Sequence, residues 1–244
     1  MARIIPLSEG AFTVDQSKKF ISFNVDNDDL QERKKGSLLV EIQPFVVITS
    51  RDILLLDTGL GFADTNGQLQ IHKNLAANGL NPSDITKVLI SHLHKDHSGG
   101  IAQPNKKIVS FENATYYINK NELDFAIEKG FPSYHKDDFL LLEKYGQLVL
   151  MKDEGILDDY IHYKVTGAHS PFHQAFKITE DGETIFFGGD VASQLHQMKS
   201  RFKAKYDYDG AAAMNLRREW WQQGEKEKWT FLFYHDIKYP VFKF

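Results

Sequence analysis

Ser91-His92-Leu93-His94-Lys95-Asp96-His97-Ser98-Gly99-Gly100 is the stretch that constrains both the fold and the chemistry of this chain. Four potential metal ligands fall within six of its residues: His92, His94, Asp96 and His97. The apolar run 88–90 directly before it predicts a strand that releases the chain into a turn. In such a turn the first two histidines face one way, and the other two ligands reach a second position nearby. Gly99 and Gly100 are expected to allow the tight backbone that the turn needs.

The residue types of this cluster suit a divalent metal. Imidazole nitrogen and carboxylate oxygen are ligands for zinc, iron or manganese when no thiolate is available. The chain contains no cysteine, so disulfides, Cys-ligated zinc, thiolate nucleophiles and iron–sulfur clusters are excluded. Its 33 acidic and 29 basic residues give a net charge of −4, which supplies no broad basic surface for a nucleic-acid partner.

The rest of the chain indicates a mixed α/β (or α+β) protein. Without repeats or linkers, the 244 residues predict one domain over 1–244. Short Val-, Ile-, Phe- and Tyr-rich runs predict strands at 45–49, 53–56, 88–90, 108–111, 115–118, 161–165, 175–178, 184–187 and 230–234. Helices are predicted at 66–78, 119–129, 137–145 and 211–223, because each of these segments stops before a glycine. The acidic stretch 26–32 is expected to be a solvated loop.

Neither a signal peptide nor a membrane span is expected. The first ten residues lack the apolar stretch of a signal peptide, and no later apolar run approaches ~18 residues. The sequence therefore predicts a soluble, cytoplasmic protein with no membrane partner.

More candidate ligands follow other apolar runs. Asp57, Asp190 and His235 each stand just beyond such a run, and His169 follows the strand predicted at 161–165. Ligands at strand ends converge on one rim when the sheets gather those ends together. We therefore expect these side chains to join the cluster at 92–97.

Together these motifs carry a family resemblance. The ordered elements are Leu56-Asp57-Thr58-Gly59, the block His92 to His97, a Thr-x-x-His element ending at His169, Gly189-Asp190 and His235-Asp236. From about Leu38 to the last few residues, the chain resembles a metallo-β-lactamase-fold hydrolase. The resemblance implies a four-layer αββα sandwich, with two β-sheets flanked by helices. It also implies a two-metal site, most often zinc, on the rim between the sheets.

The resemblance assigns a role to each motif residue. His92, His94 and His169 would hold one metal ion, whereas Asp96, His97 and His235 would hold the other, with Asp190 bridging both. Asp57 would orient a ligand histidine, although a turn-capping aspartate is an alternative. His173 would be an outer partner of the metals or a core histidine with its hydrogen bonds satisfied. Asp96 would also orient the nucleophile and shuttle a proton. Zinc is preferred, and iron or manganese would also fit.

Within the family, the chain resembles the lactonase and organophosphate-hydrolase branch. The stretch 91–100, the stretch 169–174 and the closing Phe-Tyr-His-Asp are the details that do so. In one departure, Ser193 stands where quorum-signal lactonases commonly place a tyrosine that contacts the substrate carbonyl. The resemblance implies a hydrolase that uses a metal-bridging hydroxide to cleave a lactone or carboxylic ester in a small-molecule substrate. The alternative is a phosphodiesterase or phosphotriesterase acting on nucleotides or organophosphates.

Two further predictions concern the surroundings of the site. Tyr134 and His135 on one side, and Ser193 and His196 on the other, are expected to line the substrate pocket, with a plain surface loop as the alternative for His135. In the helix predicted at 211–223, one of the adjacent tryptophans Trp220 and Trp221 is expected to face the core. The other would lie at the edge, where it could mark a homodimer contact.

Overall fold

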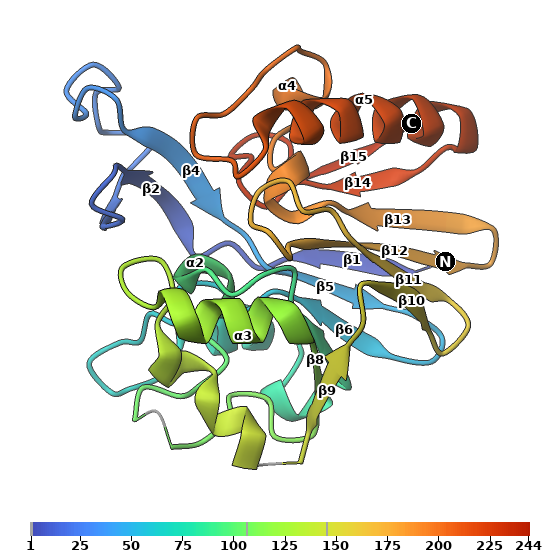
Figure 1. The fold of residues 1–244 in the computed structure, drawn as a ribbon. Coiled ribbons are helices and arrows are strands. Elements are labelled where there is room, and N and C mark those ends of the chain that lie inside the picture. Colours follow the sequence, from blue (N-terminus) through green and yellow to red (C-terminus); the bar gives the residue numbers. More distant parts are fainter. Residues whose placement is uncertain (1, 106, 145) are drawn as a thin grey trace.

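Two six-stranded β-sheets lie face to face and carry helices on their outer sides (Figure 1). The structure is a computed structural model and describes residues 2–105, 107–144 and 146–244. In order across the first sheet, the strands are β1 (Arg3–Pro6), β5 (Phe45–Ile48), β6 (Ile53–Leu56), β7 (Lys87–Leu89), β8 (Thr115–Asn119) and β9 (Leu148–Met151). Across the second they are β10 (Glu154–Leu157), β11 (Ile161–Val165), β12 (Gln174–Glu180), β13 (Glu183–Phe187), β14 (Thr230–Leu232) and β15 (Val241–Lys243).

The helices are short apart from one. They are α1 (Gln70–Ala77), α2 (Lys95–Ser98), α3 (Lys120–Lys129), α4 (Leu195–Met198) and α5 (Gly210–Glu227). Single 3₁₀ turns cover Pro82–Asp84, Lys136–Asp138, Leu140–Lys144 and Gly189–Ala192. Asn119 and Asp209 start α3 and α5, since each side chain accepts two backbone N–H groups of the first turn. Among the described residues, the helices are too short or too polar to cross a membrane.

Alternating apolar side chains build the layers. In the first sheet, Val47 and Leu54 point toward the second sheet, whereas their neighbours Val46 and Leu55 pack outward with α1 and α3. In the second sheet, Phe187 points inward. The adjacent Phe186 packs outward, against aromatic residues that belong to α5 or lie next to it. Helix, sheet, sheet and helix therefore follow one another, and the predicted αββα sandwich is confirmed.

The strand directions gather one set of ends on a single rim. β6 and β7 run parallel, and so do β13 and β14. β11 runs in the same direction as β13, because both are antiparallel to β12. Within each sheet, the carboxyl ends of these strands therefore lie at the same edge. The segments with the candidate ligands begin at these ends.

A small three-stranded sheet, absent from the sequence predictions, stands beside this rim (Figure 1, upper left). Its order is β3 (Phe20–Ser22), β2 (Gly10–Val14) and β4 (Leu38–Ile42), all antiparallel. Phe12, Val40 and Ile42 anchor it in the core between the two large sheets. The loop 26–32 that joins β3 to β4 is exposed, as predicted.

Several predicted element bounds were wrong. The helix predicted at 211–223 continues to Glu227, because Gly224 is a packing residue rather than a stop: a Cβ there would meet the Phe231 ring at 2.4 Å. The segment 108–111 makes a single β-bridge, between Val109 and Ala102. The helix predicted at 137–145 is a pair of 3₁₀ turns as far as residue 144, and residue 145 lies outside the described residues.

Both adjacent tryptophans of α5 pack against the second sheet. The ring centroids of Trp220 and Phe186 are 4.8 Å apart, and those of Trp221 and Phe242 are 5.3 Å apart. Each ring is partly buried. The homodimer contact stays a prediction.

Glu9, between β1 and β2, places its carboxylate under the loop that follows β6. Its Oε2 accepts the backbone N–H of Leu60 at 2.7 Å, while its Oε1 is buried without a hydrogen-bond partner among the described residues. Burial raises the pKa of Glu9 to about 8. The neutral carboxyl is therefore the form that the fold prefers.

Replacing Glu9 with glutamine is expected to remove a pH dependence of stability. Because the folded-state pKa of Glu9 lies above the ordinary value of 4.5 that the unfolded chain has, the folded state holds the extra proton. The free energy of unfolding should therefore fall as the pH rises from 5 to 8, by up to ~1.4 kcal/mol per pH unit. Glu9→Gln keeps an acceptor for Leu60, so its stability advantage over the wild type should grow across this range.

Urea denaturation at four pH values between 5 and 8 measures this difference. The control is Glu219→Gln, at an exposed position on α5, which should follow the wild type at each pH. A stability difference between Glu9→Gln and the wild type that is the same at every pH would contradict the assignment.

Candidate metal centre

The first group of ligand atoms joins the two large sheets. His92 and His94 follow β7, and His169 follows β11. His94 Nδ1 lies 2.9 Å from His92 Nε2 and 3.2 Å from His169 Nε2. These three side chains can all present one ligand atom to the same point, as a tripod for a metal ion does.

A second group lies beside the first. It consists of Asp96, His97 and His235, again from both sides of the sandwich. Asp96 Oδ2 is 3.7 Å from the Nε2 atoms of both His97 and His235. The donor set is thus two imidazoles and a carboxylate, which is a ligand set for a divalent cation.

Asp190 stands between the two groups. Its Oδ2 is 3.2 Å from His169 Nε2 in the first group. Its Oδ1 is 3.2 Å from His97 Nε2 and 3.0 Å from His235 Nε2 in the second. The structure therefore brings together all seven side chains that the sequence picked out as ligands, and it places the carboxylate expected to bridge between the two sets.

The protonation states of His92, His94 and Asp190 suit metal binding. Burial and the surrounding imidazoles hold the pKa of both His92 and His94 well below the usual range, so these rings are neutral, which is the form that binds metals. Although burial alone would raise the pKa of Asp190, its histidine neighbours hold it well below the usual range. Asp190 is thus a carboxylate.

Two buried atoms test whether this centre fits a cation. His97 Nε2 and Asp190 Oδ1 are buried and 3.2 Å apart, yet among the described residues neither makes a hydrogen bond of good geometry. An unsatisfied buried polar group costs about 1–3 kcal/mol, and a cation between these atoms would satisfy both. Nitrogen and oxygen donors without sulfur match zinc, iron or manganese. The residues present fit divalent metal ions.

The predicted outer partners contact the ligands. Asp57 Oδ2 is 2.8 Å from His97 Nδ1 and accepts the hydroxyl of Ser91, while Oδ1 accepts the N–H of Ser91. Asp57 thus lies where it can orient His97, and it also holds the turn after β7; these side-chain contacts go to Ser91 and His97 rather than to its own turn at Thr58-Gly59. His173 Nε2 accepts the N–H of Asp190 at 3.1 Å, and its other nitrogen lies 3.0 Å from the Thr166 hydroxyl.

Sequence reasoning missed further groups that hold the ligand rings. The Nδ1 of His169 lies 3.0 Å from Asp207 Oδ1, and the Nδ1 of His235 lies 2.7 Å from the backbone carbonyl oxygen of Glu41. Such contacts fix the ring orientation and leave the other nitrogen for a metal. Asp207 follows no apolar run or recognised motif, so nothing in the sequence marked it.

Glu122, in the first turn of α3, ties together two ligand loops. Its Oε1 accepts the N–H of Leu93, between His92 and His94, at 2.9 Å. Its Oε2 accepts the hydroxyl of Ser170, directly after His169, at 3.1 Å. The whole residue is buried. Glutamate at this helix position normally signals only helix capping, which is why the sequence did not reveal its role.

The glycines after the cluster serve a different purpose from the one expected. Gly99 has right-handed helical dihedrals, φ −59° and ψ −30°, so no special turn conformation is required. A Cβ on Gly99 would lie 2.4 Å from the Leu60 carbonyl oxygen, and one on Gly100 would lie 2.1 Å from that of Thr58. The glycines let α2 approach the backbone of the loop after Asp57 closely.

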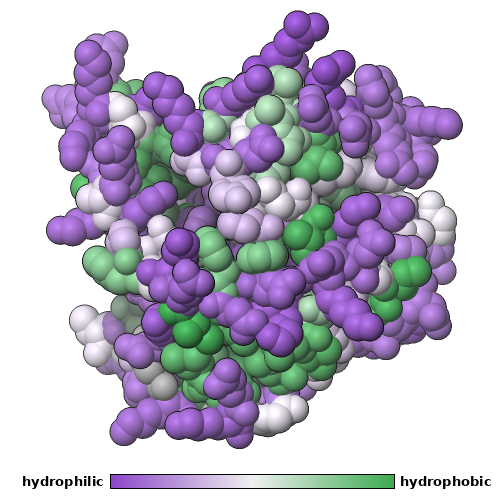
Figure 2. Space-filling model, viewed as in Figure 1, coloured by the Kyte–Doolittle hydropathy of each residue, from purple (hydrophilic) through white to green (hydrophobic). Residues whose placement is uncertain are grey.

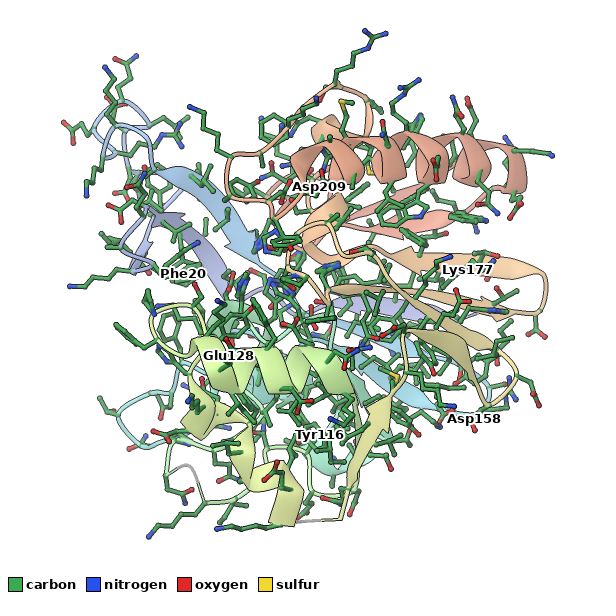
Figure 3. All side chains as sticks on the ribbon, viewed as in Figure 1. Phe20, Tyr116, Glu128, Asp158, Lys177 and Asp209 are labelled. Carbon is green, nitrogen blue, oxygen red and sulfur yellow. The ribbon has the colours of Figure 1, made fainter. Side chains whose placement is uncertain are left out.

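A cavity of about 830 Å³ opens over the centre. One wall is the small sheet, with Phe20 and Val40, and the opposite wall is the segment 193–206. Figure 2 shows the surface hollowed between the small sheet and the α5 side. In Figure 3, nitrogen-rich side chains gather in the same region, between the labelled Phe20 and Asp209.

Two of the four predicted pocket residues border this cavity. Ser193 and His196 are on its wall. Tyr134 is buried with its ring 4.8 Å from that of His94, and it supports this ligand from behind. His135 stacks on Phe131 and does not itself border the cavity. The phenol of Tyr206, which the sequence did not single out, borders the cavity.

Comparisons with known proteins agree with this architecture. Residues 41–235 match the profile of a family described as the metallo-beta-lactamase superfamily. An atrochrysone carboxyl ACP thioesterase from Passalora fulva is 31% identical over 148 residues, which cover 60% of this chain and 37% of that protein. The N-acyl homoserine lactonase AttM from Agrobacterium fabrum is 32% identical over 117 residues, covering 43% and 40%. The matched regions thus span less than half of these curated relatives.

Solved structures share the fold at lower sequence identity. A probable metal-dependent hydrolase from Staphylococcus aureus superposes with a TM-score of 0.82 at 21% identity, covering 99% of this chain and 92% of that one. The dizinc quorum-quenching lactonase AidC superposes with a TM-score of 0.75 at 20% identity, covering 98% and 89%.

Removing the Glu122 carboxylate is expected to loosen the candidate metal centre. Glu122→Ala frees the loops of His92–His94 and His169, so zinc affinity should fall about 10-fold or more, and the free energy of unfolding should fall by about 1–3 kcal/mol. Glu122→Gln keeps an acceptor for Leu93 and should lose less of both. Chelator competition measures the affinity, and urea denaturation measures the stability.

Glu128→Ala is the matched control, since Glu128 is exposed on the same helix (Figure 3). It should leave the zinc affinity unchanged. Unchanged zinc affinity in Glu122→Ala as well would show that this residue does not position the ligands.

Proposed function

The chain belongs to the metallo-β-lactamase superfamily, and on that premise we propose that it is a hydrolase that holds two divalent cations and cleaves carboxylic ester or lactone bonds. Zinc is the proposed metal, with iron or manganese as alternatives. The ligands would be His92, His94 and His169 for one ion and Asp96, His97 and His235 for the other, with Asp190 shared.

One observation carries this proposal. Seven buried or half-buried nitrogen and oxygen ligands from both sheets converge beneath an open cavity, with His97 Nε2 and Asp190 Oδ1 lacking hydrogen-bond partners among the described residues. In a purely structural cluster, each of these buried atoms would make a hydrogen bond of good geometry, whereas here they only lie 3.2 Å apart. The convergence therefore supports a metal centre that faces substrate.

Asp96 and Tyr234 would assist the reaction beside the metal ions. Two divalent cations bound here would supply Lewis-acid polarisation of the scissile carbonyl and acidify water at neutral pH. Asp96 borders the cavity, where its carboxylate can accept a proton from the attacking water and deliver it to the leaving oxygen. Tyr234 holds Asp96 in place, because its hydroxyl donates to the Asp96 backbone carbonyl at 2.5 Å.

Tyr206 offers a hydrogen bond to the substrate. Its ring centroid lies 6.1 Å from that of His169, at the wall of the cavity. Burial, with the nearby Asp190 and Asp207 carboxylates, raises the pKa of Tyr206 above its usual value. The phenol thus stays protonated and can donate to a carbonyl or leaving oxygen.

The apolar lining of the cavity and the names of the relatives favour an acyl substrate. Phe20, Val40 and Phe202 give the cavity apolar surface that suits an acyl chain. The relatives described as a thioesterase and a lactonase both act, by those names, on carboxylic acyl bonds. These points support ester or lactone cleavage ahead of phosphoester cleavage.

A substrate panel separates the two reaction classes. The zinc-loaded protein is expected to hydrolyse lactones, aryl esters and thioesters with a kcat/KM at least about 100-fold above that for aryl phosphodiesters and phosphotriesters. Product release is followed by absorbance or pH-stat titration. Faster turnover of the phosphoesters would instead support the phosphodiesterase or phosphotriesterase alternative.

Deleting single ligands should remove both metal and activity. His94→Ala and Asp190→Ala are expected to lower kcat/KM by about 1000-fold or more and to lower the metal content of the purified protein, measured by elemental analysis. His162→Ala, on β11 and outside the centre, is the control and should match the wild type in both. Full activity in either ligand variant would refute its assignment.

A further inference from the structure

The cavity wall carries an excess of positive charge outside the metal centre. Four lysines border the cavity: Lys18, Lys95, Lys203 and Lys205. The carboxylates on the same wall are Asp15, Asp96 and Asp190, and the last two belong to the centre. Asp15 is ion-paired with Lys34. The remaining charge that faces a substrate is therefore cationic.

Lys18 and Lys95 form the inner pair of these cations. Lys95 directly follows the ligand His94 and begins α2, and its ammonium lies 5.3 Å from the centre of the Phe20 ring. Lys18 lies in the link between β2 and β3, where the chain adopts φ 58°. Both side chains are half-buried. Two separate segments thus supply cations to the wall of the same cavity.

Both lysines lie near the Phe20 ring on the cavity wall. The Lys95 ammonium lies 5.3 Å from the centre of that ring, and Lys18 is two residues before Phe20 in the chain. Across the described ranges, no ion pair joins either ammonium to a carboxylate. Two cations on the wall of one cavity repel each other, and partial burial weakens the solvent screening between them. An anion between them would relieve that repulsion.

We propose that the substrate carries an anionic group, a carboxylate or phosphate, that binds between Lys18 and Lys95 while its carbonyl lies at the metal centre. The apolar surface of Phe20 and Val40 would hold the chain that joins the two ends. Lys18 is then a specificity-determining residue. This inference rests on the proposed hydrolase function and narrows its substrates to acyl compounds with a negatively charged tail.

Three matched esters test the proposal with the zinc-loaded protein. They are 4-nitrophenyl hexanoate, 4-nitrophenyl hydrogen adipate and 4-nitrophenyl 5-phosphonopentanoate, which share a leaving group and chain length and differ only at the tail. We expect kcat/KM to be about 10-fold higher for one or both anionic esters than for the neutral one at low salt, and the ratio to shrink in about 0.5 M NaCl. The better of the two anionic tails distinguishes carboxylate from phosphate.

Lys18→Gln is the informative variant. It should lower kcat/KM for the preferred anionic ester by about 5- to 10-fold, through KM, and leave the neutral ester within about 2-fold. The matched control is Lys19→Gln, because Lys19 is the exposed neighbour and does not border the cavity. It should behave as the wild type does on all three esters. Lys95 is left intact because it lies between two proposed ligands.

A binding measurement separates this inference from the hydrolase proposal. Calorimetric titration should show adipate or 5-phosphonopentanoate binding more tightly than hexanoate, and Lys18→Gln should remove that difference. If no ester is hydrolysed but this binding preference holds, the hydrolase proposal fails and the anion site stands. Equal turnover of the three esters, or equal binding of the three acids, by the wild-type protein would overturn the anion site even if hydrolysis is fast.

Discussion

A single carboxylate, Asp190, is the constraint on which the site depends. Its two oxygens face imidazoles of both ligand groups, at 3.0–3.2 Å, so its position decides whether the groups form one centre or two unrelated clusters. Asp190 comes from the second sheet, whereas His97 comes from the first. The contact therefore holds only while the two sheets keep their relative position. Phe187, three residues before Asp190, and its apolar neighbours pack between the sheets and maintain that position.

The outer contacts make the arrangement rigid before any ligand binds. Asp57 holds His97, Asp207 holds His169, and Glu122 ties the two loops of the first ligand group to α3. Each of these acids would cost free energy if it were buried without a partner, and each is satisfied by a group on a ligand loop. Burial of these acids thus helps to position the ligands. If a ligand loop moved, a carboxylate would lose its hydrogen-bond partner or become exposed to solvent.

The ligands, their outer partners Asp57 and His173, and the layer order could be predicted from the sequence, whereas the other supports could not. His92, Asp190 and His235 follow apolar runs, and a strand followed by a ligand is a local pattern. Asp207 and Glu122 act only through contacts across the fold, which no spacing records. The small sheet was missed because its strands are three to five residues long and partly exposed. Gly224 was taken for a helix end because its reason, the Phe231 ring, is tertiary.

Reaction chemistry and substrate choice are carried by different parts of the molecule. The ligands lie at the ends of core strands, where a substitution would disturb both sheets. The small sheet and its turn, which supply Phe20 and Lys18, join the core mainly through Phe12, Val40 and Ile42. Lys18, on its cavity side, lies outside this buried set and is therefore under little packing constraint. A change in the tail of the preferred substrate requires only side chains on that wall to change, while Asp190 and the histidines around it stay as they are.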